Sequence, residues 1–104
     1  MSSYPQIINI LLIGFGPHSQ RIYHPLLELS MDDTKLNLCA SVDLASSREQ
    51  IESYLLNKRL KPEMIYIEDD QNMVTNIHTS ILEKLNSIVN KYNINGVIIA
   101  TEPL

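Results

Sequence analysis

The stretch Ile10-Leu-Leu-Ile-Gly14-Phe-Gly16-Pro-His-Ser19 decides the fold, because an apolar run ends at two glycines and a segment that favours a helix follows. This order predicts a β-strand that enters a phosphate-binding turn. Gly14 allows the chain to leave the strand sharply, and Gly16 lets a pyrophosphate approach the backbone because glycine has no Cβ. Ser19 takes the third position of the G-x-G-x-x-G pattern, where a small side chain still permits close helix–strand packing. The cofactor-binding residues predicted in this turn are Gly14, Phe15, Gly16, Pro17, His18 and Ser19.

The rest of the chain alternates between apolar runs and segments with helical periodicity. Nearly continuous apolar residues predict strands at 7–13, 36–42, 64–67 and 97–100. Helices are expected from Pro17 to about residue 29, from Ser46 to the Lys58–Pro62 segment, and from about residue 73 or 75 to Tyr92. Strands that alternate with helices form parallel sheets with right-handed crossovers, so we predict an α/β fold. Residues 1–104 then form one Rossmann-like domain of three layers, βαβαβαβ, with the strand order 3-2-1-4 and an incomplete sheet.

Local signals predict how the three helices begin, bend and end. Pro25 interrupts the first helix, which should kink or restart there. Ser46 and Glu49 form an S-x-x-E capping box that opens the second helix. Gly96 is available for a left-handed cap after the third helix. Apolar residues at helical spacing predict the inner faces of the first helix (Ile22, Leu26, Leu29), the second (Ile51, Tyr54, Leu55, Leu56) and the third (Ile77, Ile81, Leu85, Ile88).

Asp43 follows the second predicted strand, where an acidic side chain can meet the ribose of a dinucleotide. Its carboxylate can accept hydrogen bonds from both ribose hydroxyls and would repel a 2′-phosphate, so it favours NAD over NADP. Arg48 could stack on adenine or meet a 2′-phosphate. The alternative interpretation is a solvent-facing residue in the first turn of the second helix. Thr101 follows the fourth strand and either lines the cofactor crevice or is an ordinary loop residue.

The remaining chemistry-bearing residues suggest neither a metal site nor a catalytic set. His24 and His78 fall in predicted helices without a partner at metal-ligand spacing, so both are interpreted as structural. The acidic segment 68–72 has no neighbouring histidine or cysteine and is interpreted as a surface loop. We therefore assign no catalytic residue and no metal ligand from the sequence.

Composition excludes several other classes of protein. The net charge of −4 and scattered lysines and arginines argue against a nucleic-acid-binding module. No apolar stretch approaches the roughly 20 residues of a membrane span, and the first residues lack the features of a signal peptide. Cys39 has no internal partner for a disulfide and should be a buried, unreactive thiol. These features lead us to expect a cytoplasmic protein.

Three stretches of the chain resemble one enzyme family. The run from Gly14 to Leu27 resembles the opening of the Gfo/Idh/MocA oxidoreductases, in which a G-x-G turn precedes a helix with a proline before an apolar residue. Ser41-Val-Asp43 resembles the end of that family's second strand. Val97-Ile-Ile-Ala-Thr101-Glu-Pro103 resembles the A-T-P step after its fourth strand, with Glu102 inserted before the proline. The resemblance covers nearly the whole chain, from about Ile7 to the end.

The resemblance implies an NAD(P)-binding domain of an oxidoreductase that acts on sugars, cyclitols or similar polyols. Such enzymes carry a Glu-Lys-Pro motif and a substrate domain further along, and the 104 residues contain neither, so we expect an N-terminal piece that is inactive alone. Two alternatives stay open: a non-catalytic regulatory domain that binds a dinucleotide, and an S-adenosylmethionine-dependent methyltransferase core. Because the fourth strand should be an exposed apolar edge, we also expect self-association or pairing with a missing segment.

Overall fold

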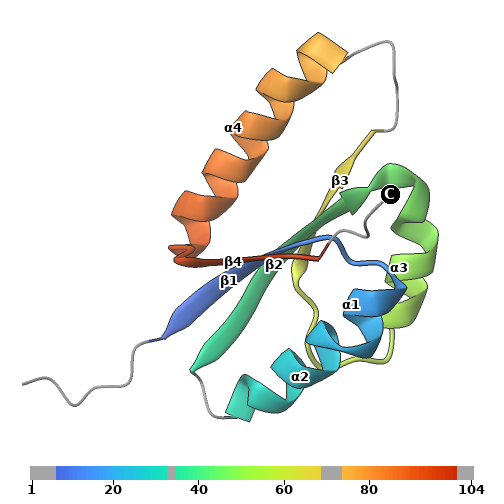
Figure 1. Ribbon diagram of the computed structural model, residues 1–104, viewed down its shortest axis with the longest axis vertical. Helices are drawn as coiled ribbons and strands as arrows, with labels where there is room; N and C mark the ends of the chain where they lie inside the picture. The colour runs from blue at the N-terminus through green and yellow to red at the C-terminus, as the bar shows by residue number, and fades with distance from the viewer. Residues whose placement is uncertain (1–6, 33–34, 69–73, 101–104) are drawn as a thin grey trace, which may run out of the picture.

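The computed structural model describes residues 7–32, 35–68 and 74–100, and side chains from 74 to 81 are not described. Within these residues, four parallel strands form one sheet in the order β3-β2-β1-β4 (Figure 1). The strands are β1 (Ile8–Ile13), β2 (Leu36–Leu44), β3 (Glu63–Ile67) and β4 (Gly96–Ile99), and the α-helices are α1 (Pro17–Arg21), α2 (Tyr23–Leu29), α3 (Arg48–Leu55) and α4 (Val74–Tyr92). The arrangement confirms the predicted α/β fold and strand order, and it is an incomplete Rossmann-like fold.

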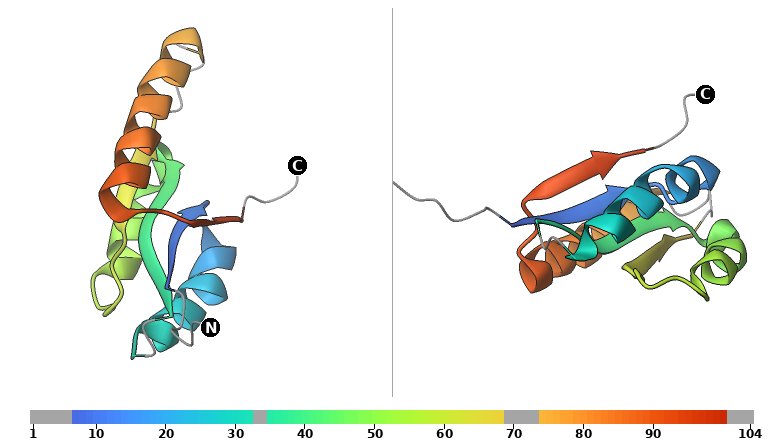
Figure 2. Two further views of the ribbon diagram at one scale, coloured as in Figure 1. Left: turned by 90° about the vertical axis from the view of Figure 1, so that its left-hand side faces the viewer. Right: turned by 90° about the horizontal axis from the view of Figure 1, so that it is seen from below.

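Helices cover both faces of the sheet. The helices α1, α2 and α3 lie against one face and α4 lies against the other, as Figure 2 shows. Neighbouring residues of β1 enter different cores, because successive side chains of a strand point to opposite faces. The core under α1–α3 consists of Ile10, Leu12, Phe15, Leu27, Leu38, Ile51, Leu55 and Leu60. The core under α4 consists of Leu11, Ala40, Val42, Ile65 and Ile88.

The first predicted helix is interrupted, as expected, and the break lies ahead of the proline. Helix α1 ends at Arg21 and α2 begins at Tyr23, with Ile22 between them at φ −117° and ψ −63°. Pro25 has no N–H to donate to the carbonyl of Arg21, so the α-helical bonding cannot continue across this point.

The predicted inner face of this helix is wrong. The three residues assigned to it, Ile22, Leu26 and Leu29, are all exposed, and Leu29 is 78% exposed. The inner face is partly polar, so apolar spacing alone indicated the wrong side of the helix. The side chains that are buried are Ser19, Gln20, His24 and Leu27.

The second predicted helix begins later than the capping box indicates. A 3₁₀ turn spans Ala45–Ser47, and α3 starts at Arg48 with Ser47 as its N-cap. The N-cap of α3 thus lies one residue after the predicted Ser46, and the Ser47 side chain makes no capping hydrogen bond. On the inner face, Ile51 and Leu55 are buried as predicted, whereas Leu56 is exposed.

Helix α4 ends in a left-handed cap formed by Asn93, whereas Gly96 was expected to supply it. Asn93 has φ 54°, and the N–H of Ile94 donates to the carbonyl of Val89 at 3.1 Å, which is the Schellman arrangement. Gly96 instead opens β4, where a Cβ would lie 2.7 Å from Cγ2 of Ile8. The glycine is therefore required by the close approach of β4 to β1. Of the predicted inner face of α4, Ile88 is buried, while Ile77 and Ile81 lie outside the described side chains.

A β-bulge at Cys39 shifts the register of β2 against β1. Ile10 pairs with Leu38 and Leu11 pairs with Ala40, so Cys39 is an extra residue on β2. Before the bulge, Leu38 faces α1–α3, and after it Ala40 faces α4. Cys39 is only partly buried, contrary to the expected full burial, and burial raises the pKa of its thiol. Because the bulge leaves Cys39 out of the pairing, the side chain of Asp43 lies on the α1–α3 face.

Strand β4 is an edge strand, as predicted, and one of its faces lacks a cover. Val97 and Ile99 are 57% and 72% exposed. They pair with Leu11 and Ile13 of β1, so both side chains lie on the α4 face of the sheet. The described chain therefore presents an uncovered apolar edge.

Candidate functional site

A pocket of about 630 Å³ lies where the C-terminal ends of the strands meet the start of α1. Parallel strands present their carboxyl ends at the same edge of a sheet, which is where ligands of open α/β folds bind. Five of the predicted site residues line it: Gly14, Gly16, Pro17, His18 and Asp43. The other lining residues are the apolar Ile13, Val42, Leu44, Ile67 and Ala100. The predicted turn and the predicted acid after β2 therefore share one pocket.

The two glycines of the turn differ in what the protein itself requires of them. Gly14 has φ 99°, a conformation that other residues rarely adopt, and its N–H donates to the carbonyl of Val42 at 2.8 Å. Gly16 has φ −79° and ψ −168°, which any residue can adopt. A Cβ on Gly16 would have no atom within 4 Å. Neither backbone conformation nor packing within the described protein requires a glycine at position 16, although as the N-cap of α1 the position suits glycine better than alanine.

Phe15 contributes its backbone to the site and its side chain to the core. Its ring is fully buried and makes edge contacts with His24 and Tyr54, at centroid distances of 5.7 and 6.1 Å. Its N–H donates to Oδ2 of Asp43 at 2.6 Å. The side chain of Phe15 thus anchors the turn, and Phe15, predicted as a cofactor-binding residue, is fully buried and is not among the residues that line the pocket.

Asp43 joins the end of β2 to the glycine turn. Besides the Phe15 N–H on Oδ2, its Oδ1 accepts the N–H of Leu44 at 2.6 Å. These two bonds fix the orientation of the carboxylate. A carboxylate offers about four lone-pair sites, so each oxygen keeps capacity for another donor. Asp43 therefore presents an oriented acceptor to the pocket.

Ser19 and Gln20 hold α1 in place from inside. The Ser19 hydroxyl is fully buried and donates to the carbonyl of Gly14 at 2.7 Å. The Gln20 amide donates to the carbonyl of Phe15 at 3.0 Å and exchanges hydrogen bonds of 2.8 and 2.9 Å with the amide of Gln50 on α3. Ser19, predicted as a cofactor-binding residue, thus directs its side chain to the turn and away from the pocket.

Below the turn, a buried histidine links three segments of the chain. His24 is fully buried, and its Nε2 lies 2.8 Å from the carbonyl of Leu60. A carbonyl only accepts, so Nε2 carries a hydrogen, an assignment made from the hydrogen-bond partners. Nδ1 lies 2.9 Å from the hydroxyl of Tyr54, which also lies 2.8 Å from the carbonyl of Gln20. His24 is therefore a structural residue, as the sequence suggested.

Glu28 of α2 fastens the segment that follows α3. Its Oε2 accepts the N–H of Arg59 at 2.9 Å and the N–H of Leu60 at 3.2 Å. The hydrogen bond from Leu60 is the main cause that lowers the pKa of the Glu28 carboxyl. Through Leu60, this contact also supports the carbonyl that His24 binds.

Arg48 lies in a different pocket from the predicted site. A second hollow of about 700 Å³ lies along the outer edge of β3, between α3 and α4. There the Arg48 guanidinium pairs with Glu52 at 3.0 Å and lies over the Tyr66 ring at 5.2 Å. Burial, and next the negative charge of Glu52, raise the pKa of the Tyr66 hydroxyl. Arg48 is not among the residues lining the Asp43 pocket.

Sequence reasoning missed the apolar walls of the pocket. Leu44 and Ile67 are the last residues of β2 and β3, and both line it. The sequence held a signal for each of them: Leu44 directly follows Asp43, and Ile67 ends the third predicted strand. Thr101 and His78 were also singled out, and Thr101 and the His78 side chain lie outside the part of the chain that the structure describes.

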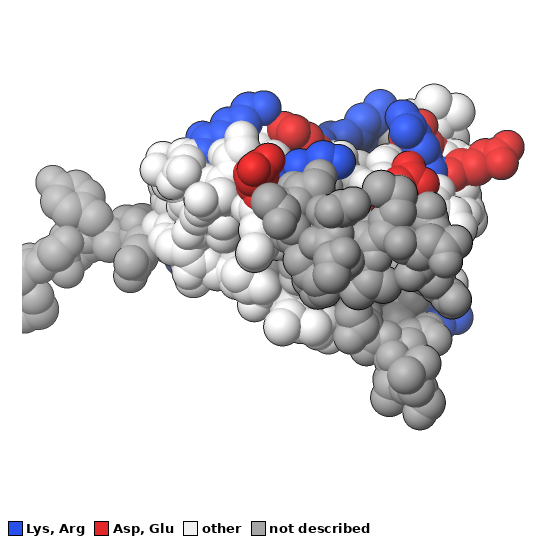
Figure 3. Space-filling view, turned by 90° about the horizontal axis from the view of Figure 1, so that it is seen from above, with Lys and Arg blue, Asp and Glu red and all other residues white. Residues whose placement is uncertain are grey.

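Other kinds of site have no counterpart among the described residues. No group of three or more His, Cys, Asp or Glu side chains there could hold a metal ion. No described helix is both long and apolar enough to cross a membrane. Acidic and basic side chains are interspersed along one border of the face in Figure 3, without a continuous basic patch on that face. The Asp43 pocket is therefore the candidate ligand-binding site.

Comparisons with known proteins do not identify a family for this chain. No family model matches the chain, and neither a curated protein nor a solved structure matches it.

Proposed function

We propose that the pocket bounded by Gly14–His18 and Asp43 binds a dinucleotide, NAD in preference to NADP. On this proposal the chain is the cofactor-binding part of an oxidoreductase that acts on sugars, cyclitols or similar polyols. The oxidoreductase class and the substrates rest on the sequence resemblance. The bound nicotinamide would supply hydride chemistry, and we assign no catalytic residue within the chain.

The open space at Gly16 is the observation that carries the binding proposal. Backbone conformation accounts for Gly14, and the approach of Ile8 accounts for Gly96. Gly16 alone has an ordinary φ and empty surroundings on the wall of the pocket. A ligand phosphate that must come close to the backbone would require a residue without a Cβ there.

Asp43 supports the choice of a ribose-containing ligand. Its carboxylate lines the pocket with an orientation fixed by the Phe15 and Leu44 N–H groups. An oriented carboxylate can accept hydrogen bonds from ribose hydroxyls, and its charge opposes a 2′-phosphate. Leu44 and Ile67 provide apolar surface for a base.

The direct test is a fluorescence titration of the purified chain with NADH and with NADPH. The chain has no tryptophan, so nicotinamide fluorescence can be followed without that background. We expect saturable binding, with NADH bound at least about tenfold more tightly, equivalent to about 1.4 kcal/mol. If neither binds while S-adenosylmethionine saturates the same sample, the dinucleotide proposal is refuted in favour of a methyltransferase-like site.

A further inference from the structure

The Asp43 pocket has an unusual balance of charge for an anionic ligand. Its described lining contains the carboxylate of Asp43 and otherwise glycine, proline, apolar residues and His18. Neither lysine nor arginine is among these lining residues. A pyrophosphate entering this pocket would bring negative charge to a site with no fixed cation among the described residues.

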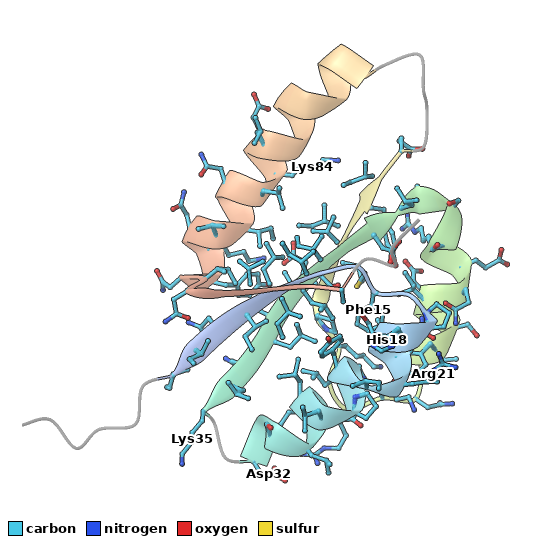
Figure 4. All side chains as sticks on the ribbon, in the orientation of Figure 1. Phe15, His18, Arg21, Asp32, Lys35 and Lys84 are labelled. Carbon is cyan, nitrogen blue, oxygen red and sulfur yellow. The ribbon has the colours of Figure 1, made fainter. Side chains whose placement is uncertain are left out.

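His18 is the lining residue that can become positive. It lies in α1, next to the turn that carries Phe15 (Figure 4), and its side chain is exposed. The edge of its ring packs against Tyr23 of α2, with centroids 5.6 Å apart. Imidazole is the side chain that ordinarily changes charge between about pH 5 and 8. His18 is therefore placed and chemically suited to supply a positive charge only when it binds a proton.

We propose that His18 is a proton-dependent ligand for the phosphates of the bound nucleotide, so that binding takes up a proton. This inference rests on the proposed function and specifies how the same site is regulated. The protonated ring donates hydrogen bonds to phosphate oxygens and offsets their charge. The neutral ring offers one donor and no charge.

Three other titratable groups lie near His18. Asp43 of β2 shares the pocket, Tyr23 of α2 contacts the ring, and Arg21 lies one turn further along α1. Carboxylates, phenols and guanidinium groups ordinarily titrate near pH 4, near pH 10 and above about pH 12. The facing residues of β1 and β4 in the pocket, Ile13 and Ala100, are apolar. A change in affinity between about pH 5.5 and 8.5 would therefore report on His18.

The direction of the effect follows from linkage. A ligand that prefers the protonated ring binds more tightly as pH falls through the histidine range, and the gain stops once the free protein is already protonated. A hydrogen bond to a charged group adds about ten- to hundredfold in affinity, and an exposed ring belongs at the lower end. We expect affinity to fall about tenfold between about pH 5.5 and 8.5.

Calorimetric titration with ADP-ribose tests the inference. This probe carries the pyrophosphate and both riboses of NAD without the acid-sensitive reduced nicotinamide. Repeating each titration in buffers of different ionisation enthalpy gives the number of protons taken up, which a tenfold affinity change limits to about half a proton near neutral pH. His18→Gln should bind weakly with a flat pH profile, and His18→Arg should bind tightly with a flat profile. Adenosine, which has no phosphate, should show no dependence on His18.

The outcomes separate this inference from the function it rests on. Saturable ADP-ribose binding with the same proton uptake in wild type and His18→Gln overturns the role of His18 and leaves dinucleotide binding standing. A pH-independent wild-type affinity does the same. If ADP-ribose, NADH and NADPH all fail to saturate the chain at every pH, both the proposed function and this inference are refuted.

Discussion

Replacing Gly16 with alanine should separate ligand binding from folding. The new Cβ meets no atom within 4 Å, and φ −79° suits alanine. Gly→Ala at a compatible position gains about 0.4–1 kcal/mol through the unfolded chain. Position 16 is the N-cap of α1, where alanine is worse than glycine by about 0.5–1 kcal/mol. The two contributions offset, so the free energy of unfolding should change by less than about 0.5 kcal/mol.

Binding should respond very differently to the same change. A methyl group at position 16 would enter the space that we assign to the phosphates, so NADH affinity should fall more than about tenfold. Urea unfolding measures the first quantity and NADH fluorescence measures the second. The reasoning is refuted if Gly16→Ala binds NADH as tightly as wild type, or if it unfolds at a clearly lower urea concentration.

The other two glycines are matched controls for this experiment. Gly14→Ala forces a left-handed backbone and should cost about 1–3 kcal/mol of stability. Gly96→Ala places a Cβ 2.7 Å from Ile8, so overpacking should cost about 1–3 kcal/mol while the pocket residues stay in place. Gly96→Ala should therefore lower stability and retain NADH affinity, the opposite of Gly16→Ala.

Substitutions at three further positions test other parts of the structure. Asp43→Asn keeps an acceptor for the Phe15 N–H but loses the charge, so NADH affinity should fall about tenfold while NADPH affinity holds or rises. Glu28→Ala leaves the Leu60 N–H without its acceptor and should lower the free energy of unfolding by about 1–2 kcal/mol in urea melts. The lowered pKa of Glu28 means that its stabilisation is present above about pH 4.3 and lost as pH falls further, so Glu28→Gln should show a shallower acid loss. The uncovered β4 edge should make the wild-type chain self-associate, and Ile99→Lys should make it monomeric in sedimentation experiments.

Each of these expectations has a result that contradicts it. Equal losses of NADH and NADPH affinity in Asp43→Asn would remove this carboxylate from the ribose. Identical acid unfolding of wild type and Glu28→Gln would show that the carboxylate does not contribute through its charge. A wild-type monomer at every concentration would mean that the β4 edge needs no partner.

The sequence was sufficient to predict the sheet and the position of the candidate site. Apolar strand runs and helical spacing set the element order, and right-handed crossovers then limit the strand order to few arrangements. Gly14 and Asp43 are far apart along the chain, yet both lie at the carboxyl ends of strands of one parallel sheet. Their approach at this edge therefore follows from topology, whereas the face to which Asp43 points depends on the bulge at Cys39.

The support beneath the site could not be predicted in the same way. The Gln20–Gln50 pair and the His24–Tyr54 contact join residues on separate helices, and no periodicity relates them. The inner face of α1 and α2 was predicted wrongly because the buried Gln20 and His24 are polar side chains satisfied by hydrogen bonds, so apolar spacing does not mark that face. The Arg48–Glu52 ion pair, in contrast, joins residues four apart on one helix, and this spacing can be recognised in the sequence.

The bulge at Cys39 allows β2 to absorb an extra residue, at a point remote from the pocket, without turning Asp43 to the other face of the sheet. Side chains alternate between the two faces on either side of the bulge. Before it the even-numbered residues of β2 face α1–α3, and after it the odd-numbered residues do. If β2 ran through residue 39 without the bulge, Asp43 would point toward α4, and the turn around Phe15 would lose its acceptor. The identity of residue 39 should therefore matter little. Deletion of residue 39 should also be tolerated, because Leu38 and Ala40 already pair with successive residues of β1 and Asp43 would keep its face of the sheet.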